Sequence, residues 1–232
     1  MKTPRSTSRP KPAKANLAPR DLAREAYLRL RDAICDGTLT SGTRITETDL
    51  SERLNMSRTP VREAIYRLEA EGLLTHVPRS GLTVMELDHQ MIMELYTIRE
   101  ALEGTAARLA AQHASEVEIE ALAELMDKAT SAMNDAKSFS RISDKIHGLI
   151  YLAAHNRFLL RSLENIASTI SLLPRLTGDQ LRLSEWHEQH QAIVKAIRNR
   201  DPDAAETAAR THIRTARKQR LEVLMESETM RR

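Results

Sequence analysis

Three histidines lie on apolar faces of segments that have helical periodicity. Apolar residues follow His147 and His190 at offsets of three, four and seven, and alanines lie seven and four residues before His212 and four after it. Residues at these offsets share one face of a helix, so each imidazole is expected to point toward the interior of a bundle. One such histidine is most often a hydrogen-bonded core residue, whereas three imidazoles that converge on a cavity can bind a divalent metal.

A second group of residues that could do chemistry begins at Ser57. Pro60 is tolerated only in the first turn of a helix, which fixes a helix start near Arg58, and the Ser57 side chain can cap that start. Arg58 and Arg62 share a face, and Thr59 lies beside them. Arginine is the usual bidentate partner of guanine, and a helix enters the major groove with its N-terminal residues against base edges. The pattern therefore favours a helix that reads DNA.

The alternative is an amphipathic surface helix with a solvated polar face, because arginines four residues apart are common. The surrounding segments weaken that alternative. A helix and a short turn precede the arginine-rich segment, and two β-prone runs follow it, separated by a turn that contains Arg79 and Gly81. This is the order of elements in a winged helix.

The elements that must position these residues can be placed from periodicity, caps and turn residues. We expect β-strands at 73–77 and 82–85, and a turn over 38–46. The expected helices are 21–36, 47–54, 58–71, 89–113, 116–135, 138–154, 157–173, 179–199 and 202–226. The predicted fold is mainly α: a winged helix-turn-helix with three helices and a β-hairpin, followed by an all-α antiparallel helical bundle.

These elements divide the chain into four parts. We expect a disordered basic tail over 1–18, a DNA-binding domain over 19–87, an all-α effector-binding and dimerisation domain over 88–226, and a flexible end over 227–232. The tail holds three of the eight prolines, and it is either a solvated segment or an electrostatic arm on DNA phosphates.

Composition limits the class of protein more than it defines a function. The formal net charge is +3, but six positive charges and no acid fall within residues 1–20, so the rest of the chain is mildly acidic. DNA binding must therefore rest on the local motif. The single cysteine, Cys35, excludes an intrachain disulfide and favours a reducing, cytoplasmic location. We also expect no membrane span, because no apolar run approaches ~18 residues.

Residues 27–84 resemble the winged helix of the GntR family of regulators. The matching stretches are Tyr27–Arg31, Gly37–Leu39, Gly42–Ile45, Asp49–Ser51, Ser57–Ala64 and Glu71–Leu74. The resemblance implies that Arg58, Thr59 and Arg62 are the main DNA-contacting residues, with Ser57 at the helix start and Arg79 and Gly81 at the wing tip. Thr48 stands where some relatives have a contacting arginine, so that contact is lost or altered here.

Residues 90–215 resemble the ligand-binding FCD domain of the FadR subgroup. The matching stretches are Arg99–Glu103, His147–Asn156 and His190–Ile197, followed by Asp201, Ala204 and His212. Many members bind a metal with one Asp and three His, and the three histidines match. Ser143 occupies the usual Asp position, and Asp144 lies one residue later on the same face. Asp144 is either a fourth ligand or a surface charge beside a cavity lined by Ser143. Zinc, nickel and manganese all suit such a site.

The resemblance also implies a small effector, commonly an organic acid, in the bundle. Arg99 could bind its carboxylate, or it could instead pair with Glu103 on the same helix. Ser143 and, more weakly, His187 are further candidates for this pocket. No nucleophile–base pair is visible, so we expect no enzyme.

The function expected from these observations is that of a homodimeric, effector-controlled transcriptional regulator, most often a repressor, that binds operator DNA. Two alternatives belong to other classes. A metal-dependent enzyme using the three histidines would keep its turnover without residues 1–88. A non-specific architectural protein would bind DNA with an affinity set by salt alone.

Overall fold

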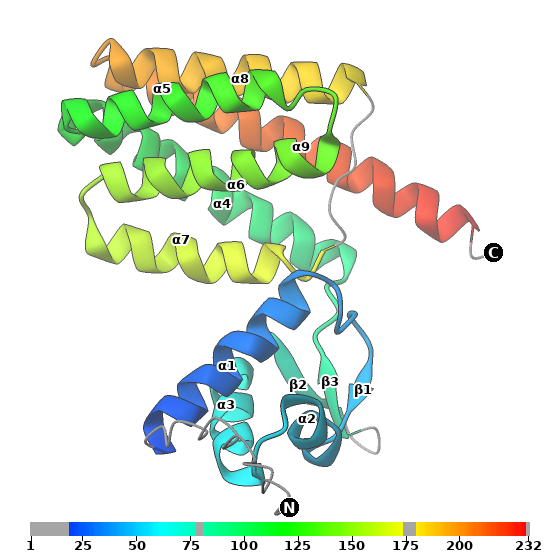
Figure 1. Ribbon diagram of the computed structural model, residues 1–232. Coiled ribbons are helices and arrows are strands. Elements are labelled where there is room, and N and C mark those ends of the chain that lie inside the picture. The colour runs from blue at the N-terminus through cyan, green and yellow to red at the C-terminus, as the bar shows by residue number, and fades with distance from the viewer. Residues whose placement is uncertain (1–18, 78–80, 174–179, 231–232) are drawn as a thin grey trace, which may run out of the picture.

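The structure of the chain is a computed structural model that describes residues 19–77, 81–173 and 180–230 (Figure 1). The predicted basic tail and Arg79 lie outside the described residues. Within them, the chain forms a small domain with a three-stranded sheet and, above it, a larger all-helical bundle. The predicted mainly α fold is therefore confirmed.

The small domain consists of three helices and a sheet. Its elements are α1 (Pro19–Cys35), β1 (Arg44–Ile45), α2 (Glu47–Leu54), α3 (Arg58–Ala70), β2 (Leu74–Val77) and β3 (Gly81–Val84). One apolar cluster joins the helices to the sheet, and its fully buried members include Leu30, Val61, Leu68 and Leu73. Burial of this apolar area is the main force that holds α3 against α1.

The sheet differs from the expected hairpin, because a third strand is present. The strand order is β1-β3-β2, and both pairs are antiparallel. Sequence reasoning assigned residues 38–46 to a turn, but Arg44 pairs with Thr83 and Ile45 pairs with Leu82. A two-residue strand is too short to show the alternation that identifies strands in a sequence.

The connection from α2 to α3 is fixed by local chemistry. The Thr46 side chain accepts a hydrogen bond from the Asp49 amide, and the Asp49 carboxylate accepts one from the Thr46 amide, which makes a capping box at the start of α2. At the other end Asn55 has a φ of 54°, the left-handed conformation that Asn tolerates better than most residues. The chain therefore turns sharply into α3 and exposes the N-terminal end of that helix.

The bundle contains the other six helices that the structure describes. They are α4 (His89–His113), α5 (Glu116–Ser131), α6 (Ala136–Ala153), α7 (Arg157–Ile170), α8 (Gln180–Arg198) and α9 (Pro202–Met230). The side chains of Asp88, Ser115, Asp135 and Asn156 cap α4 to α7. The largest apolar cluster lies between these helices and includes Leu122, Phe139, Ile146 and Ile197.

Two bundle boundaries differ from the sequence prediction by four residues, and the others differ by at most three. Helix α5 ends at Ser131 rather than at 135, because a turn precedes the Asp135 cap of α6. Helix α9 continues to Met230, so residues 227–230, expected in a flexible end, are helical. The C-terminal part of α9 projects beyond the bundle (Figure 1). In the described part of the chain, no helix is both long and apolar enough to cross a membrane.

The turn that follows α7 connects the bundle to the small domain. Leu172, just beyond α7, is 7% exposed and belongs to the apolar cluster of the small domain. Its carbonyl accepts a hydrogen bond from the Ser41 hydroxyl at 3.0 Å, and the neighbouring Ser171 hydroxyl lies 2.9 Å from the Cys35 sulfur. Leu173 points the other way, into a third cluster with Ile92.

A candidate DNA-reading helix and a buried histidine site

The N-terminal end of α3 presents the predicted DNA-contacting residues to solvent. Arg58, Thr59 and Arg62 are exposed, and the buried face of the helix is formed by other residues, among them Val61 and Ile65. Ser57 occupies the cap position with extended backbone, but its exposed side chain makes no capping hydrogen bond. The expected side-chain cap is therefore absent, and the Ser57 hydroxyl instead faces solvent with the arginines.

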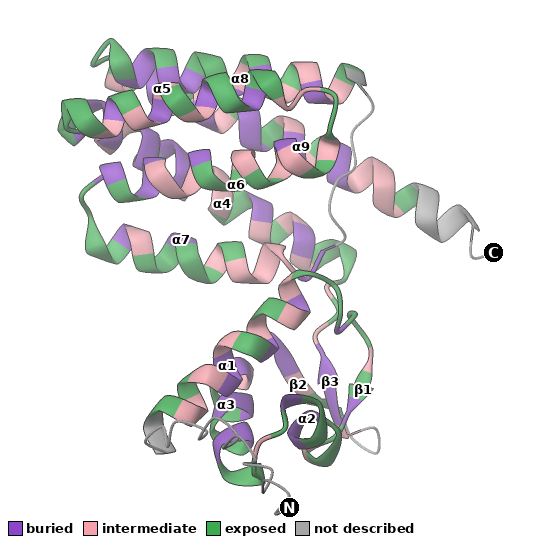
Figure 2. Ribbon diagram, in the orientation of Figure 1, coloured by how far each residue is buried: buried purple, intermediate pink, exposed green. Residues whose placement is uncertain are grey.

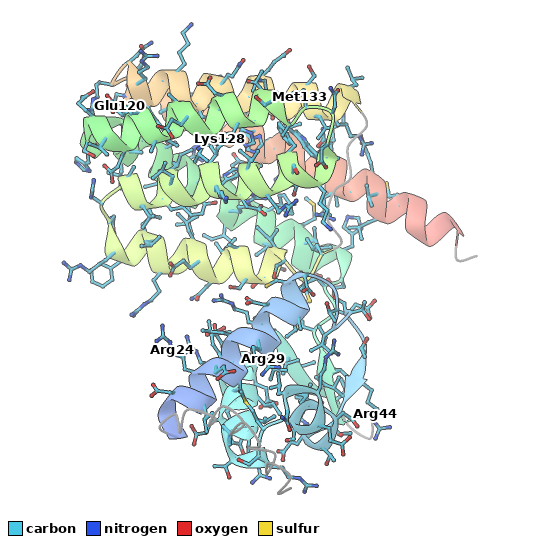
Figure 3. The ribbon with its side chains drawn as sticks, viewed as in Figure 1. Arg24, Arg29, Arg44, Glu120, Lys128 and Met133 are labelled. Carbon is cyan, nitrogen blue, oxygen red and sulfur yellow. The ribbon has the colours of Figure 1, made fainter. Side chains whose placement is uncertain are left out.

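The remaining candidates of the small domain lie around this helix. Thr48 is exposed on α2. Gly81 begins β3 with a φ of +80°, a conformation that favours glycine. A Cβ atom at Gly81 would lie 3.9 Å from the Nε atom of Arg44, so these two residues are neighbours at the wing. Arg44 projects from the edge strand β1 (Figure 3), and sequence reasoning did not select it because β1 was not predicted.

On the exposed face of α3, Arg62 forms an ion pair with Glu47 of α2. Its Nε and Nη2 atoms donate to the two carboxylate oxygens of Glu47 at 3.0 and 2.8 Å. Hydrogen bonding to Arg62 lowers the pKa of Glu47, and the charge of Arg58 acts in the same direction. Glu47 lies fifteen residues from Arg62, so no local pattern in the sequence could have indicated this pair.

We expect Glu47→Gln to strengthen DNA binding a few-fold. The substitution removes a carboxylate that would repel the phosphates of a bound duplex, and it releases Arg62 from a partner that would compete with DNA. Fluorescence anisotropy at fixed salt, with a duplex selected by the wild-type protein from a random pool, measures the change. Glu120→Gln, on the bundle helix α5, is the control. Weaker binding by Glu47→Gln would show instead that Glu47 positions Arg62 for its contact.

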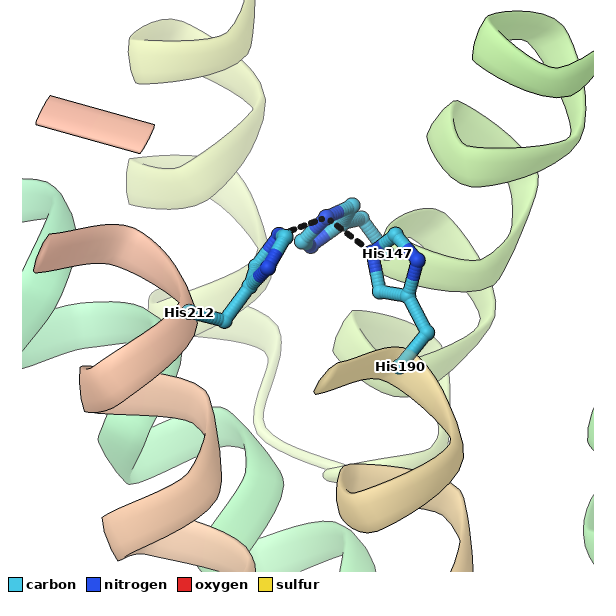
Figure 4. A group of neighbouring side chains, drawn as sticks. All are labelled: His147, His190 and His212. Carbon is cyan, nitrogen blue, oxygen red and sulfur yellow. Dashed lines mark hydrogen bonds between the residues drawn. The ribbon is translucent and has the colours of Figure 1, made fainter. Parts of the chain in front are cut away.

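Helices α6, α8 and α9 bring the three predicted histidines together (Figure 4). The Nε2 atom of His147 lies 3.2 Å from the Nε2 atom of His190 and 3.2 Å from that of His212. One nitrogen from each ring can be chosen so that all three lie within 4.8 Å of one another. His190 and His212 are only 1% and 5% exposed. The expected convergence of three imidazoles is present.

Hydrogen bonds orient two of these rings with Nε2 toward the centre of the cluster. Nδ1 of His147 donates to the Glu103 carboxylate at 2.7 Å, and Nδ1 of His212 lies 2.9 Å from the side-chain oxygen of Gln189, to which it can donate. A ring that donates through Nδ1 directs the lone pair of Nε2 inward, which is how metal-binding histidines are usually held. Nδ1 of His190 is buried without a hydrogen-bond partner among the described residues. Three inward nitrogen donors of this kind suit a divalent metal.

The electrostatics keep two of the imidazoles neutral. Burial, followed by the nearby imidazoles, lowers the pKa of His190 well below its usual value. Burial and His147 lower the pKa of His212 to about 3. Neutral imidazole is the form that binds metals, so His190 and His212 are in the metal-binding form at neutral pH.

Glu103 is a buried partner of His147 that sequence reasoning did not identify. Burial alone would raise the pKa of Glu103, but the charge of Arg99 and the hydrogen bonds from His147 and Arg99 hold it well below its usual range. Arg99 donates to Glu103 at 2.5 Å, and Glu103 accepts from His147. The sequence indicated the Arg99–Glu103 pair, but not the contact with His147, which lies 44 residues away.

We expect the metal-free protein to lose stability as the pH falls below about 6.5. The unfolded His212 takes up a proton near that pH, whereas the folded His212, with its pKa of about 3, does not. The free energy of unfolding therefore falls progressively as the pH drops from 6.5 to 3. The loss from this residue alone is about 2 kcal/mol at pH 5. Urea unfolding with EDTA at pH 7 and pH 5 measures the loss. It should shrink in His212→Gln and stay unchanged in His113→Gln, an exposed control; an equal loss in all three proteins would contradict the assignment.

A cavity of about 580 Å³ opens beside His147 and His212. Arg99 and Ser143 line it, as expected for effector-binding residues. Ser143 also lies 3.5 Å from Nε2 of His190. Asp144 lines the cavity, but it is exposed and is not part of the close cluster of ligand atoms.

The structure does not bring His187 to this cavity. Its Nε2 atom lies 3.2 Å from the Thr130 hydroxyl on α5 and 3.0 Å from Nε2 of Gln191, and His187 is absent from the cavity lining. The three-residue offset from His190 is enough to turn the side chain toward α5. We therefore withdraw His187 as an effector contact.

A winged helix with an exposed arginine-rich helix, joined to a helical bundle with an internal cavity, defines a class of protein. It is the architecture of a DNA-binding regulator that also carries a ligand-binding domain. Residues 22–84 match the family described as bacterial regulatory proteins, gntR family, and residues 94–215 match the FCD domain. The chain belongs to the GntR family and carries an FCD domain.

Individual relatives agree with this assignment. The chain is 32% identical over 184 residues to the Nta operon transcriptional regulator of Aminobacter aminovorans, covering 79% of this chain and 87% of that protein. It is 33% identical over 186 residues to a probable D-xylose utilization operon transcriptional repressor of Paenarthrobacter nicotinovorans, covering 78% and 80%. The solved structure of E. coli McbR/YncC has the same fold, with a TM-score of 0.74 at 23% identity over 89% of this chain and 98% of that one.

These findings establish the broad function. The chain is a DNA-binding transcriptional regulator and not an enzyme, and its FCD domain is of a kind that binds small-molecule effectors. The alternative of a metal-dependent enzyme is thereby set aside.

Proposed function

We propose that the protein is a homodimeric repressor of the FadR subgroup, and that a small carboxylate in the bundle controls its affinity for operator DNA. The observation that carries the proposal is the 580 Å³ cavity beside three converging imidazoles in the same chain as the DNA-reading helix. The proposed division is a DNA-binding domain over 19–87 and an effector-binding and dimerisation domain over 88–226. The protein would act in the cytoplasm, where bacterial operators lie.

The DNA-binding half of the proposal assigns base and phosphate contacts to one surface. Arg58 and Arg62 would bind guanine edges, while Ser57 and Thr59 would bind phosphate at the helix start. Thr48 offers only a short hydroxyl in place of an arginine. Arg79 and Gly81 would add contacts from the wing. The proposed DNA-contacting residues are therefore Ser57, Arg58, Thr59, Arg62, Thr48, Arg79 and Gly81. In a dimer, two such surfaces would match a two-fold operator.

In the effector-binding domain, we propose that His147, His190 and His212 bind a metal. Asp144 is the candidate for a fourth ligand, and zinc, nickel or manganese would suit the set. A bound metal would supply a Lewis acid to which an effector carboxylate can bind. Glu103 orients His147 through its Nδ1 atom, and Arg99 is held by Glu103 at the cavity wall. Ser143 adds a hydroxyl on the same wall.

Thermal-shift screening with small carboxylic acids tests this function. An acid that binds only the folded protein stabilises it, by about 2.7 kcal/mol at a concentration of one hundred times its Kd. We expect at least one acid to raise Tm, more strongly with added zinc, and to weaken binding of the selected duplex in anisotropy. The proposal that an effector regulates DNA binding is wrong if no acid raises Tm in the presence of zinc, nickel or manganese and if none changes the affinity for the duplex.

A further inference from the structure

The cavity has two walls of different chemistry. The wall formed by α4, α6 and α9 carries the charged and imidazole groups, including Arg99, Glu103, His147 and His212. Another wall is formed largely by α7 and is mostly apolar. Its apolar side chains are Leu160, Ile166, Ala167 and Ile170, with Leu152 of α6 and Leu173 after α7.

Helix α7 leaves much of its apolar surface uncovered. Only Leu159 and Leu163 are buried among its fourteen residues. Exposed and half-buried residues cover most of its length (Figure 2). Leu160 and Ile170 are half-buried and Ala167 is exposed, and all three line the cavity. Apolar surface left in contact with water is unfavourable, so a ligand that covers this wall gains affinity from it.

The same wall disfavours a polyhydroxylated ligand. A sugar acid in the cavity would place several hydroxyls against leucine, isoleucine and alanine side chains that cannot hydrogen-bond to them. Glu164 is the charged residue that α7 contributes to the lining, and its negative charge does not attract an acid. The polar groups that suit a carboxylate lie on the other wall.

We infer that the effector is an amphipathic carboxylic acid, with its acid group at the histidines and an aliphatic or aromatic body along α7. This inference rests on the proposed function and names the chemical class of its effector. A volume of about 580 Å³ is ample for such a molecule.

A matched set of acids tests the inference by calorimetric titration of the zinc-loaded full chain. The probes are octanoate and 3-phenylpropionate as apolar acids, gluconate and citrate as hydroxylated acids, and 1-octanol as a molecule without an acid. We expect an apolar acid to bind at least roughly tenfold more tightly than gluconate, citrate or 1-octanol. Ala167→Glu should weaken binding of that acid by a similar factor, whereas Asn165→Glu, which places the same charge at an exposed position of α7 outside the cavity lining, should not.

The outcomes separate this inference from the proposed function. Tighter binding of gluconate or citrate than of the apolar acids would overturn the inference and leave the regulator intact. Absence of binding by every acid, with duplex affinity insensitive to all of them, would overturn both. Circular dichroism checks that the Ala167→Glu variant still folds. If the folded variant binds the apolar acid as tightly as the wild type, the inference is also overturned.

A second, independent observation concerns the end of α7. We propose that residues 171–173 mechanically couple the bundle to the DNA-binding domain. Leu172 is buried in the cluster of the small domain, and Leu173 is buried in the bundle. Two hydrogen-bonding contacts, Ser41 to Leu172 and Cys35 with Ser171, tie the same turn to the small domain. Cys35 and Ser171 also line the cavity, so a ligand along α7 lies against this connection.

Differential scanning calorimetry tests the coupling without any effector. We expect the wild-type protein to unfold in one cooperative transition, and Leu172→Ala to unfold in two because its domains no longer support each other. Leu159→Ala is the matched control: it removes a buried leucine of α7 that packs within the bundle. It should lower Tm and keep one transition. A single transition in Leu172→Ala, or two in the wild type, would overturn the coupling.

Discussion

Arg58→Ala is expected to weaken binding of the selected duplex by roughly 5- to 150-fold, which corresponds to about 1 to 3 kcal/mol for one bidentate contact to guanine. Arg58 is exposed in the first turn of α3, opposite the buried face of that helix, so its truncation removes no packing. The loss should be largest for one base position, since the contact reads a base edge. Anisotropy with duplexes that vary single positions measures both effects.

The control for this prediction is another exposed arginine at a helix start. Arg157 begins α7 in the bundle, away from the small domain, and Arg157→Ala should leave duplex affinity unchanged. If Arg58→Ala binds the selected duplex as tightly as the wild type, α3 does not read DNA through this residue. If it weakens all duplexes equally, Arg58 contacts phosphate rather than a base.

The second large effect is expected for metal binding by His190→Ala. The structure offers three inward imidazoles, and removal of one should lower the affinity for zinc by more than about 100-fold, since even loss of an orienting partner costs ~10 to 100-fold. Glu103→Gln should fall within that smaller range, because it orients His147 without joining the cluster. Metal analysis after dialysis, followed by competition with a chelator, measures both variants.

His155→Ala provides the matched control for the metal prediction. His155 follows α6, is exposed and contacts Glu118, outside the cluster. It should retain zinc like the wild type. Equal zinc content in wild type, His190→Ala and His155→Ala would contradict a metal role for the three histidines, and they would then be hydrogen-bonded residues of the cavity wall.

The sequence predicted features that depend on local chemistry. The helix starts at Glu47, Arg58, His89, Glu116 and Arg157 agree with the expected positions, because caps and apolar periodicity act over a few residues. The same periodicity indicated that each histidine faces the bundle interior, whereas their convergence on one site was implied by the resemblance to the FCD domain. Short-range signals are thus sufficient for the order of the helices and for most of their buried faces.

Features that depend on long-range contacts could not be predicted in this way. Strand β1 exists because Ile45 pairs with Leu82, and Glu47 and Glu103 find their partners 15 and 44 residues away. Leu172 packs in a domain that ends almost ninety positions earlier in the chain. His187 shows the converse error, because helical offset alone does not tell which neighbouring helix receives a side chain.

The most direct test of the central claim is the specificity ratio, the affinity for the selected duplex divided by that for a shuffled duplex at the same salt. If α3 reads DNA sequence, the wild-type protein should show a ratio of at least about 10³ at physiological salt. The ratio should be clearly lower for Arg58→Ala. A wild-type ratio near unity, with binding that follows salt alone, would contradict sequence-specific reading by α3.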